Sequence, residues 1–240
     1  MTMRKPVFRR FSELTPRDVN VELQVHTSWT DGKATSREVL ETARARGVGA
    51  LAFTEHVRED TDWYPDFFRE IDANRKQFSD MAVYIGVETK AMDEQGRLDL
   101  SESVLAAAEI VLGSVHRFPD DRGGYLDFKT LSAEETAEIE FRLSMGMIRN
   151  APIDVLAHPG GMYQRRHGEF PERYFREMMI ATLERPVAIE INSSYLVNMA
   201  RFIDLCREID PIVSIGSDAH RLDEIGTCRD LLLDMGIGTP

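Results

Sequence analysis

Seven short apolar runs, separated by stretches with helical periodicity, constrain the fold of this chain most strongly. Runs of this length fit buried strands, and amphipathic stretches between them are typical of βαβ units. The runs cover residues 21–26, 50–56, 82–88, 109–116, 154–159, 187–192 and 212–220. This alternation predicts an α/β fold with a parallel sheet.

The intervening segments carry helix signals. Thr35 and Glu38 have the spacing of a capping box before an apolar stripe, and Gly47 is a suitable terminator. Ser132 and Glu135 repeat the same pattern. We expect further helices over residues 66–78, 172–184, 199–209 and 223–235.

The length of 240 residues fits one α/β barrel or two small domains. No Ser/Gly-rich linker or change in composition divides the chain, so we predict a single domain over residues 1–240, with residues 1–18 as an N-terminal extension.

Charge and cysteine content limit the partners and the compartment. The 29 basic and 41 acidic residues give a net charge of −12, which repels nucleic acid backbones and acidic membranes. Cys206 and Cys228 lack CxxC spacing, and the first twenty residues lack the apolar region of a signal peptide. No apolar run reaches membrane-spanning length. We expect a cytoplasmic protein without extended nucleic acid or membrane partners.

Polar residues collect at the C-terminal ends of the predicted strands, where five of the six histidines lie. In a parallel barrel these ends meet at one rim, where sites are built. Imidazole and carboxylate groups together suit Zn, Mn or Fe, and the absence of cysteine ligands argues against a structural zinc knuckle. The strand-end residues are His26, His56, Glu88, His116, His158, Asp218 and His220.

The first predicted strand also carries polar residues where a buried strand would have apolar ones. Alternation places Gln24 and His26 on one face together with Glu22, so three polar groups need partners if that face is buried. We interpret this face as a ligand face.

Each residue alone also has an ordinary explanation. His158 fits a hydrogen-bonded turn residue, Glu88 a paired surface carboxylate, and Asp218 a helix N-cap. Their common position at one end of the sheet favours a metal site.

These motifs resemble the PHP family, the polymerase and histidinol phosphatase superfamily of metal-dependent phosphoesterases. The resemblance runs from about residue 19 to 222, through "QVHTSWTDG", "TEH", "GVE", "GSVH", "AHPGG", "EINSS" and "GSDAH" in that order. It implies a distorted (β/α)7 barrel with its ligands at the C-terminal strand ends, holding two or three divalent cations.

The resemblance also implies a ligand set, in which Glu88 bridges the first two cations. Gln24 departs from the family pattern, where a histidine is usual. Because an amide oxygen is a poorer donor for zinc-like ions, we expect the first cation to be bound more weakly or to be a harder metal. The first cation would contact Gln24, His26, Glu88 and Asp218, the second Glu88, His116 and His158, and the third Asp31, His56 and His220.

The predicted activity is hydrolysis of a phosphate ester by hydroxide that the cations activate, with a small phosphorylated metabolite such as histidinol phosphate as substrate. Asp218 and His220 are the candidate catalytic residues. Arginine forks match phosphate oxygens, and the candidate substrate-binding residues are Arg117, Arg165, Arg166, Asn192 and Arg221.

Three alternatives stay open. The chain could cleave phosphodiesters within the same family, or it could be a degenerate PHP module that binds a nucleotide or protein without turnover. A C–N hydrolase of the amidohydrolase type also has strand-end histidines.

Overall fold

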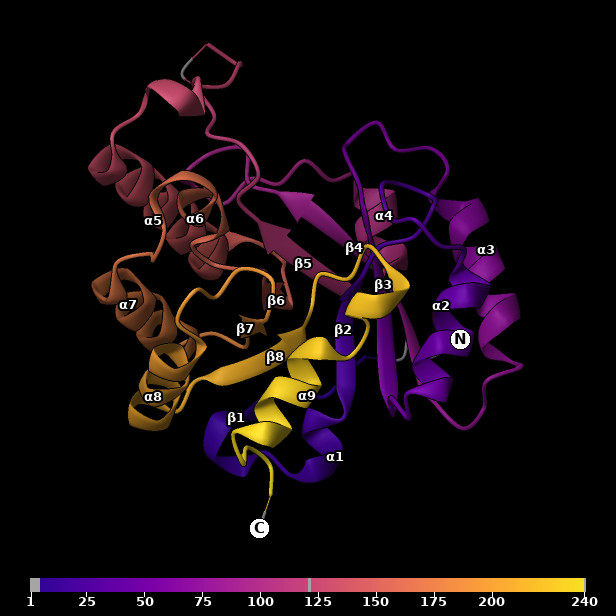
Figure 1. The fold of residues 1–240 in the computed structure, drawn as a ribbon. Coiled ribbons are helices and arrows are strands. Elements are labelled where there is room, and N and C mark those ends of the chain that lie inside the picture. The colour runs from indigo at the N-terminus through magenta and orange to yellow at the C-terminus, as the bar shows by residue number, and fades with distance from the viewer. Residues whose placement is uncertain (1–4, 121, 240) are drawn as a thin grey trace.

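The computed structural model describes residues 5–120 and 122–239, which form one eight-stranded sheet in the order β1-β8-β7-β6-β5-β4-β3-β2 (Figure 1). Strands β2 to β8 run parallel to their neighbours, and β1 pairs antiparallel with β8. The strands are β1 (Arg9–Arg10), β2 (Val21–Val25), β3 (Ala50–His56), β4 (Ala82–Lys90), β5 (Ile110–Ser114), β6 (Val155–Leu156), β7 (Ala188–Asn192) and β8 (Ile212–Gly216).

Helices connect successive strands of this sheet (Figure 1). No helix in the described part of the chain is both long and apolar enough to span a membrane. The helices are α1 (Pro16–Val19), α2 (Ser36–Ala45), α3 (Tyr64–Arg75), α4 (Glu102–Ala107), α5 (Ala133–Asn150), α6 (Gly161–His167), α7 (Glu172–Thr182), α8 (Met199–Ile209) and α9 (Thr227–Asp234).

The predicted alternation of strands and helices is confirmed. Each of the seven apolar runs coincides with one of the strands β2 to β8, of which only β4 extends past its run, to Lys90. The capping boxes at Thr35 and Ser132 are both formed. Three short helices, α1, α4 and α6, and the strand β1 were not predicted, because segments this short carry little periodicity. Most of the predicted extension is described and contains β1, but residues 1–4 lie outside the described residues.

The two edge strands of the parallel sheet meet only at their C-terminal ends. There the Ala219 N–H donates to the Gln24 carbonyl oxygen at 3.0 Å, and the His26 N–H donates to the Ala219 carbonyl oxygen at 2.9 Å. At the other end, Arg9 and Arg10 of β1 pair with β8 instead. The predicted distorted barrel is therefore joined at one end by this seam between β2 and the segment after β8.

The strands separate two apolar cores. A small inner core is built only from residues of the strands or directly beside them, and the larger outer core joins the helices to the outer face of the sheet. The inner core consists of Leu23, Ala52, Ile110, Leu112, Val155, Ala157 and Ala188. It fills the N-terminal half of the barrel interior and leaves the C-terminal half to polar side chains.

A β-bulge in β2 corrects the predicted ligand face. The register with β3 shifts between Glu22 and Val25, so strict alternation fails there. Leu23 joins the inner core and Gln24 also turns inward, whereas the Glu22 carboxylate accepts hydrogen bonds from the Ser217 and Gly226 N–H groups outside the barrel. Glu22 therefore does not share a face with His26.

Candidate metal centre

The predicted ligands other than Gln24 meet at the C-terminal ends of the parallel strands, within ion-pair distance of one another. They come from segments far apart in the sequence, and only closure of the sheet brings them to one place. We call them the histidine–carboxylate cluster: His26, Asp31, His56, Glu88, His116, His158, Asp218 and His220.

Glu88 of β4 is the centre of this cluster, and its two oxygens face different histidines. Oε1 lies 2.7 Å from His158 Nε2 and 3.2 Å from His116 Nε2. Oε2 lies 3.4 Å from His26 Nε2 and 3.0 Å from His56 Nδ1. This position between two sets of imidazole nitrogens is the one expected of a bridging carboxylate.

Two acids complete the cluster on either side of His26. Asp218 Oδ1 lies 3.0 Å from His26 Nε2 in the buried part of the site. Asp31 is more exposed, and its oxygens lie 3.4 Å from His56 Nε2 and 3.3 Å from His220 Nε2. The cluster therefore has a buried half and an outer half that share His26 and His56.

The chemistry of the cluster fits bound cations. Both ring nitrogens of His26, Oε2 of Glu88 and Oδ1 of Asp218 are buried without a hydrogen-bond partner among the described residues. Each such atom costs about 1–3 kcal/mol if it stays unsatisfied. Candidate ligand atoms form three groups, in each of which all atoms lie within 4.8 Å of one another. A cation in each group would satisfy these atoms.

A comparison of the sequence with known families agrees with this arrangement. The family described as PHP domain matches residues 22–194, which is more than half of the chain. The chain belongs to the PHP domain family. The predicted family is thus confirmed.

Curated relatives and a solved structure are similar over most of their length. A "Probable phosphatase" of Caldicellulosiruptor bescii is 26% identical over 221 residues, which cover 88% of this chain and 84% of that protein. Another "Probable phosphatase", of Vibrio cholerae, is 30% identical over 223 residues, which cover 86% of this chain and 80% of that protein. The histidinol phosphate phosphatase of Lactococcus lactis, solved with zinc, L-histidinol and phosphate, superposes with a TM-score of 0.70 at 18% identity, covering 90% and 94%. This structural likeness shows that the PHP barrel is shared.

Gln24 is the predicted PHP ligand that the structure places differently. Its side chain is buried beneath the cluster, and its Oε1 accepts a hydrogen bond from Asn192 Nδ2 at 3.1 Å. Its Nε2 has no partner among the described residues. One of the two lone pairs of this oxygen is therefore used by Asn192, and the role of Gln24 as a ligand stays a prediction.

Two candidate ligands have unusual backbone conformations. His158 has φ of 27° and Asp218 has φ of 51°, a region that residues other than glycine rarely adopt. The His158 N–H donates to Glu190 Oε2 at 2.7 Å, which fixes the turn after β6. Strain of this kind persists where surrounding contacts hold it, and here it directs both side chains into the PHP site.

Glu55 holds the loop that carries Asp31. Its buried carboxylate accepts hydrogen bonds from the Thr27 N–H at 2.8 Å, from Thr27 Oγ1 at 2.6 Å and from the Thr30 hydroxyl. The loop then passes so close to His26 that a Cβ at Gly32 would lie 2.3 Å from the His26 carbonyl oxygen. Only glycine fits, which explains the Asp-Gly pair in the motif.

The charges of the cluster shift its pKa values. Burial lowers the pKa of His56 and of His158, but the neighbouring Glu88 outweighs it and raises each to about 9. Burial likewise raises the pKa of Glu88, yet the charges of His116 and His56 bring it well below 4.5. Protons on the histidines thus balance the carboxylates, and a cation that binds there must displace them.

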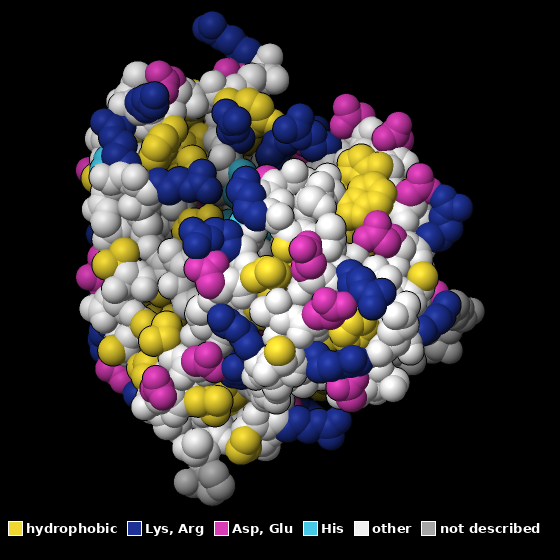
Figure 2. All heavy atoms as spheres, turned by 45° about the vertical axis from the view of Figure 1, so that its right-hand side comes forward, with side chains coloured by type: hydrophobic (Ala, Val, Ile, Leu, Met, Phe, Trp, Pro, Cys, Tyr) yellow, Lys and Arg dark blue, Asp and Glu magenta, His cyan; other side chains and the backbone are white. Residues whose placement is uncertain are grey.

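A hollow of about 450 Å³ opens beside Glu88 and His116. Figure 2 shows histidine side chains at the bottom of a hollow on one face, with several Lys and Arg side chains around it. The local charge at the mouth is thus opposite to the net charge of the chain. The hollow is lined by His56, Val57, Arg58, Glu88, Lys90, His116, Arg117 and Tyr125.

The predicted substrate-binding residues have different surroundings. Arg117 lines this hollow. Arg165 Nη2 lies 3.4 Å from the Tyr195 hydroxyl, and the Tyr195 ring lies 4.6 Å from the His158 ring. Both arginines are therefore near the PHP site.

The structure does not bring the other three to the mouth. Arg166 donates to backbone carbonyl groups of the segment 128–131, and Arg221 forms two hydrogen bonds with Asp223. Asn192 is fully buried and bonded to Gln24 and Glu190. A position next to a ligand in sequence does not fix the direction of a long side chain, so these predictions lack structural support.

Some residues at the site were not predicted. Arg58 and Lys90 each follow a candidate ligand by two positions on or just after the same strand, so alternation would have placed them on the same side. Glu55 was visible as the middle residue of "TEH". Glu190 was likewise visible as the first residue of "EINSS", and Tyr195 directly follows that motif.

Proposed function

We propose that the chain hydrolyses phosphate monoesters of a small metabolite, with two or three divalent cations held by the histidine–carboxylate cluster. The class of enzyme rests on the comparisons, in which the relatives are named phosphatases and the sequence belongs to the PHP family. The observation that carries the proposal is Glu88, whose oxygens each face two imidazoles beneath a basic hollow.

Bound divalent cations supply a water of lowered pKa and neutralise charge on the phosphoryl oxygens. Arg117 and Arg58 then orient the phosphate over Glu88, since both line the same hollow, whereas Lys90, which also lines it, is paired with Asp99. Their positive charge also attracts the substrate anion from solution.

His220 fits the role of a ligand better than that of an acid. Its Nδ1–H donates to the Asp218 carbonyl oxygen at 2.8 Å, so Nε2, 3.3 Å from Asp31, offers its lone pair once its proton is displaced. Imidazoles oriented by a second hydrogen bond of this kind are typical metal ligands. We assign Asp218 and His220 to cation binding, and we leave protonation of the leaving group to solvent.

The size of the hollow favours a small substrate. About 450 Å³ lies at the lower end of the range for small-molecule sites. The exposed Tyr125 ring lies 5.8 Å from the Arg117 guanidinium carbon and forms the outer wall for the group that the phosphate esterifies.

The test is hydrolysis of para-nitrophenyl phosphate by protein loaded with Mn or Zn, before and after chelation. We expect turnover that chelation abolishes and that readdition of the cation restores. Bis-(para-nitrophenyl) phosphate in parallel measures diesterase activity. Hydrolysis that continues unchanged after complete removal of metal would contradict the proposal.

The buried amide of Gln24 favours one alternative, a PHP module that binds a ligand without turnover. Gln24→His separates the two, because an imidazole is the better donor for zinc-like cations. If the unaltered protein is nearly inactive and the variant is not, the site is degenerate. A fall from an existing activity indicates that Gln24 belongs to a working site.

A further inference from the structure

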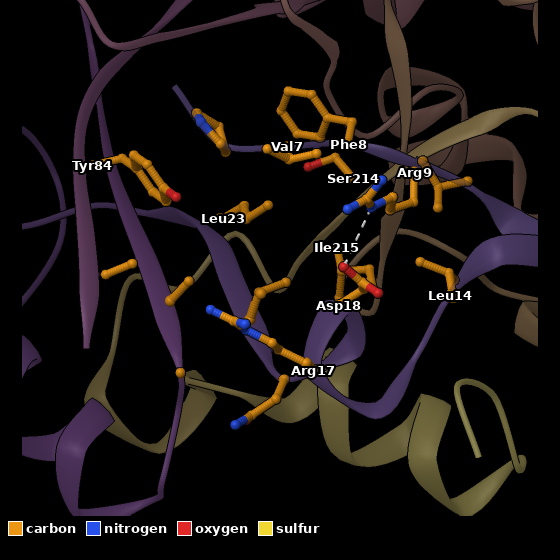
Figure 3. Close-up of a pocket in the computed structure, with 17 residues that line it drawn as sticks. Val7, Phe8, Arg9, Leu14, Arg17, Asp18, Leu23, Tyr84, Ser214 and Ile215 are labelled. Carbon is orange, nitrogen blue, oxygen red and sulfur yellow. Dashed lines mark ion pairs between the residues drawn. The ribbon is translucent and has the colours of Figure 1, made fainter. Parts of the chain in front are cut away.

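A second hollow, of about 380 Å³, lies at the opposite end of the barrel from the histidine–carboxylate cluster. It is bounded by the segment 6–18, by the residues at the starts of β2, β3 and β4, and by residues 213–215 of β8 (Figure 3). The opening exists because β2 and β8 are joined only at their C-terminal ends, and the two residues of β1 cover little of the gap between them.

The walls of this hollow present slightly more apolar than polar surface. Figure 3 shows Val7, Phe8 and Leu23 around the same space, with Tyr84 on one side and Leu14 on the other. The residues at the strand starts are Gly49, Ala50 and Ala82, whose small side chains leave the space open.

One buried polar group lines the hollow without a partner. The Ser214 side chain is 2% exposed, and its Oγ has no hydrogen-bond partner among the described residues. A buried hydroxyl left in this state is uncommon, and a ligand in the hollow would satisfy it.

The charges at the rim do not cancel. Arg9 Nε lies 3.7 Å from Asp18 Oδ1, so these two form an ion pair (Figure 3). Arg17 also lines the hollow, and it makes no hydrogen bond or ion pair with another described residue. Arg17 still lies close enough to Asp18 to help lower the pKa of that carboxyl, so two arginines share one carboxylate and a net positive charge is left for a ligand.

We propose that this hollow binds a small organic monocarboxylate with a compact apolar body. The body lies against Phe8 and Leu23, the Ser214 hydroxyl donates to the ligand, and Arg17 balances the carboxylate. The site is distinct from the proposed catalytic centre, although both are built on β2 and β8.

The experiment is isothermal titration calorimetry of the protein with 3-phenylpropionate, at low salt. We expect one equivalent to bind. Ala82→Phe fills the hollow from an exposed position and should abolish binding, whereas Ala73→Phe, exposed on α3, should bind as the unaltered protein does. Arg17→Gln should weaken binding about tenfold, and Arg17→Lys should weaken it less, because charge-assisted hydrogen bonds are the strong ones.

Glu88→Gln locates the bound probe, because it alters only the opposite end of the barrel. Unchanged affinity in this variant supports the proposal, and lost affinity shows that the carboxylate binds at the cluster instead. The proposal is overturned if the unaltered protein does not bind the probe at millimolar concentration. It is also overturned if Ala82→Phe and Arg17→Gln both bind the probe as tightly as the unaltered protein does. Arg17 is exposed, so its variants should fold and give a measurable affinity even if Ala82→Phe does not fold.

Discussion

The two ends of this barrel use the same strands in opposite ways. At the C-terminal end, histidines and acids converge until buried ring nitrogens and carboxylate oxygens have no partner but one another. At the N-terminal end, the interior is filled by Leu23, Ala52, Ile110 and Ala188, and one serine hydroxyl is unsatisfied. One half of each strand thus specifies the fold, and the other half presents chemistry.

The strongest test of this comparison changes one residue at each end. Glu88→Gln removes the shared carboxylate, and we expect phosphatase activity to fall by about 10³-fold or more, since cation stabilisation of the transition state is worth several kcal/mol. Elemental analysis should show less bound metal. Ser214→Ala, on β8 at the other end, should change neither quantity, and a comparable loss in that variant would break the comparison.

Removal of the cations should reverse the pH dependence of stability. In metal-free protein the pKa values of His56 and His158 are raised from 6.5 to about 9. Their protonated forms stabilise the fold fully below about pH 6.5, and this contribution is lost as pH rises through about 9. Metal-loaded protein should gain stability over the same window, because protons then compete less with the cations.

Thermal unfolding at several pH values, with and without chelator, measures how stability changes with pH in the metal-free and the metal-loaded protein. We call this change the slope. The double variant His56→Gln, His158→Gln should lose part of the metal-free slope, because His26 and His220 of the same cluster also have raised pKa values. If the slope of the double variant equals that of the unaltered protein, His56 and His158 do not cause it.

Glu55→Gln should weaken the outer half of the cluster while the barrel stays folded. The amide cannot accept all of the hydrogen bonds from Thr27 and Thr30, so the loop that carries Asp31 loosens. Residues that orient metal ligands typically change affinity by about 10- to 100-fold. Metal titration should show one cation bound more weakly, and Glu38→Gln, in the capping box of α2, should leave all affinities unchanged.

Arg117→Gln should raise KM for an aryl phosphate about tenfold through loss of a charge-assisted contact. Arg221→Gln is the matched control, because Arg221 is paired with Asp223 away from the hollow. Equal effects of the two substitutions would show that only the overall charge matters.

The smallest effect on activity is expected from the inner core. Ile110→Val removes one buried methyl group and should lower the free energy of unfolding by about 1 kcal/mol. Turnover per folded molecule and metal content should not change. Chemical denaturation and a saturating assay measure the two properties separately.

Strand positions and the convergence of the candidate ligands could be predicted from sequence, because short apolar runs mark buried strands and parallel strands bring their C-terminal ends to one edge. The side of β2 on which Glu22 lies could not be predicted, because no residue pattern in the strand marks the bulge that breaks the alternation. The directions of Arg166 and Arg221 depend on carbonyl and carboxylate groups brought near by the fold. The hollow beneath the barrel depends on where β2 and β8 separate, which a tertiary contact decides.

The seam at Ala219 also has a consequence for biosynthesis. This residue lies between Asp218 and His220, and its hydrogen bonds reach back to Gln24 and His26. A chain emerging from the ribosome therefore carries His26, His56, Glu88, His116 and His158 long before the segment that completes their surroundings is translated. Until then those side chains have no closed rim to hold them, so we expect cations to bind in the last stage of folding.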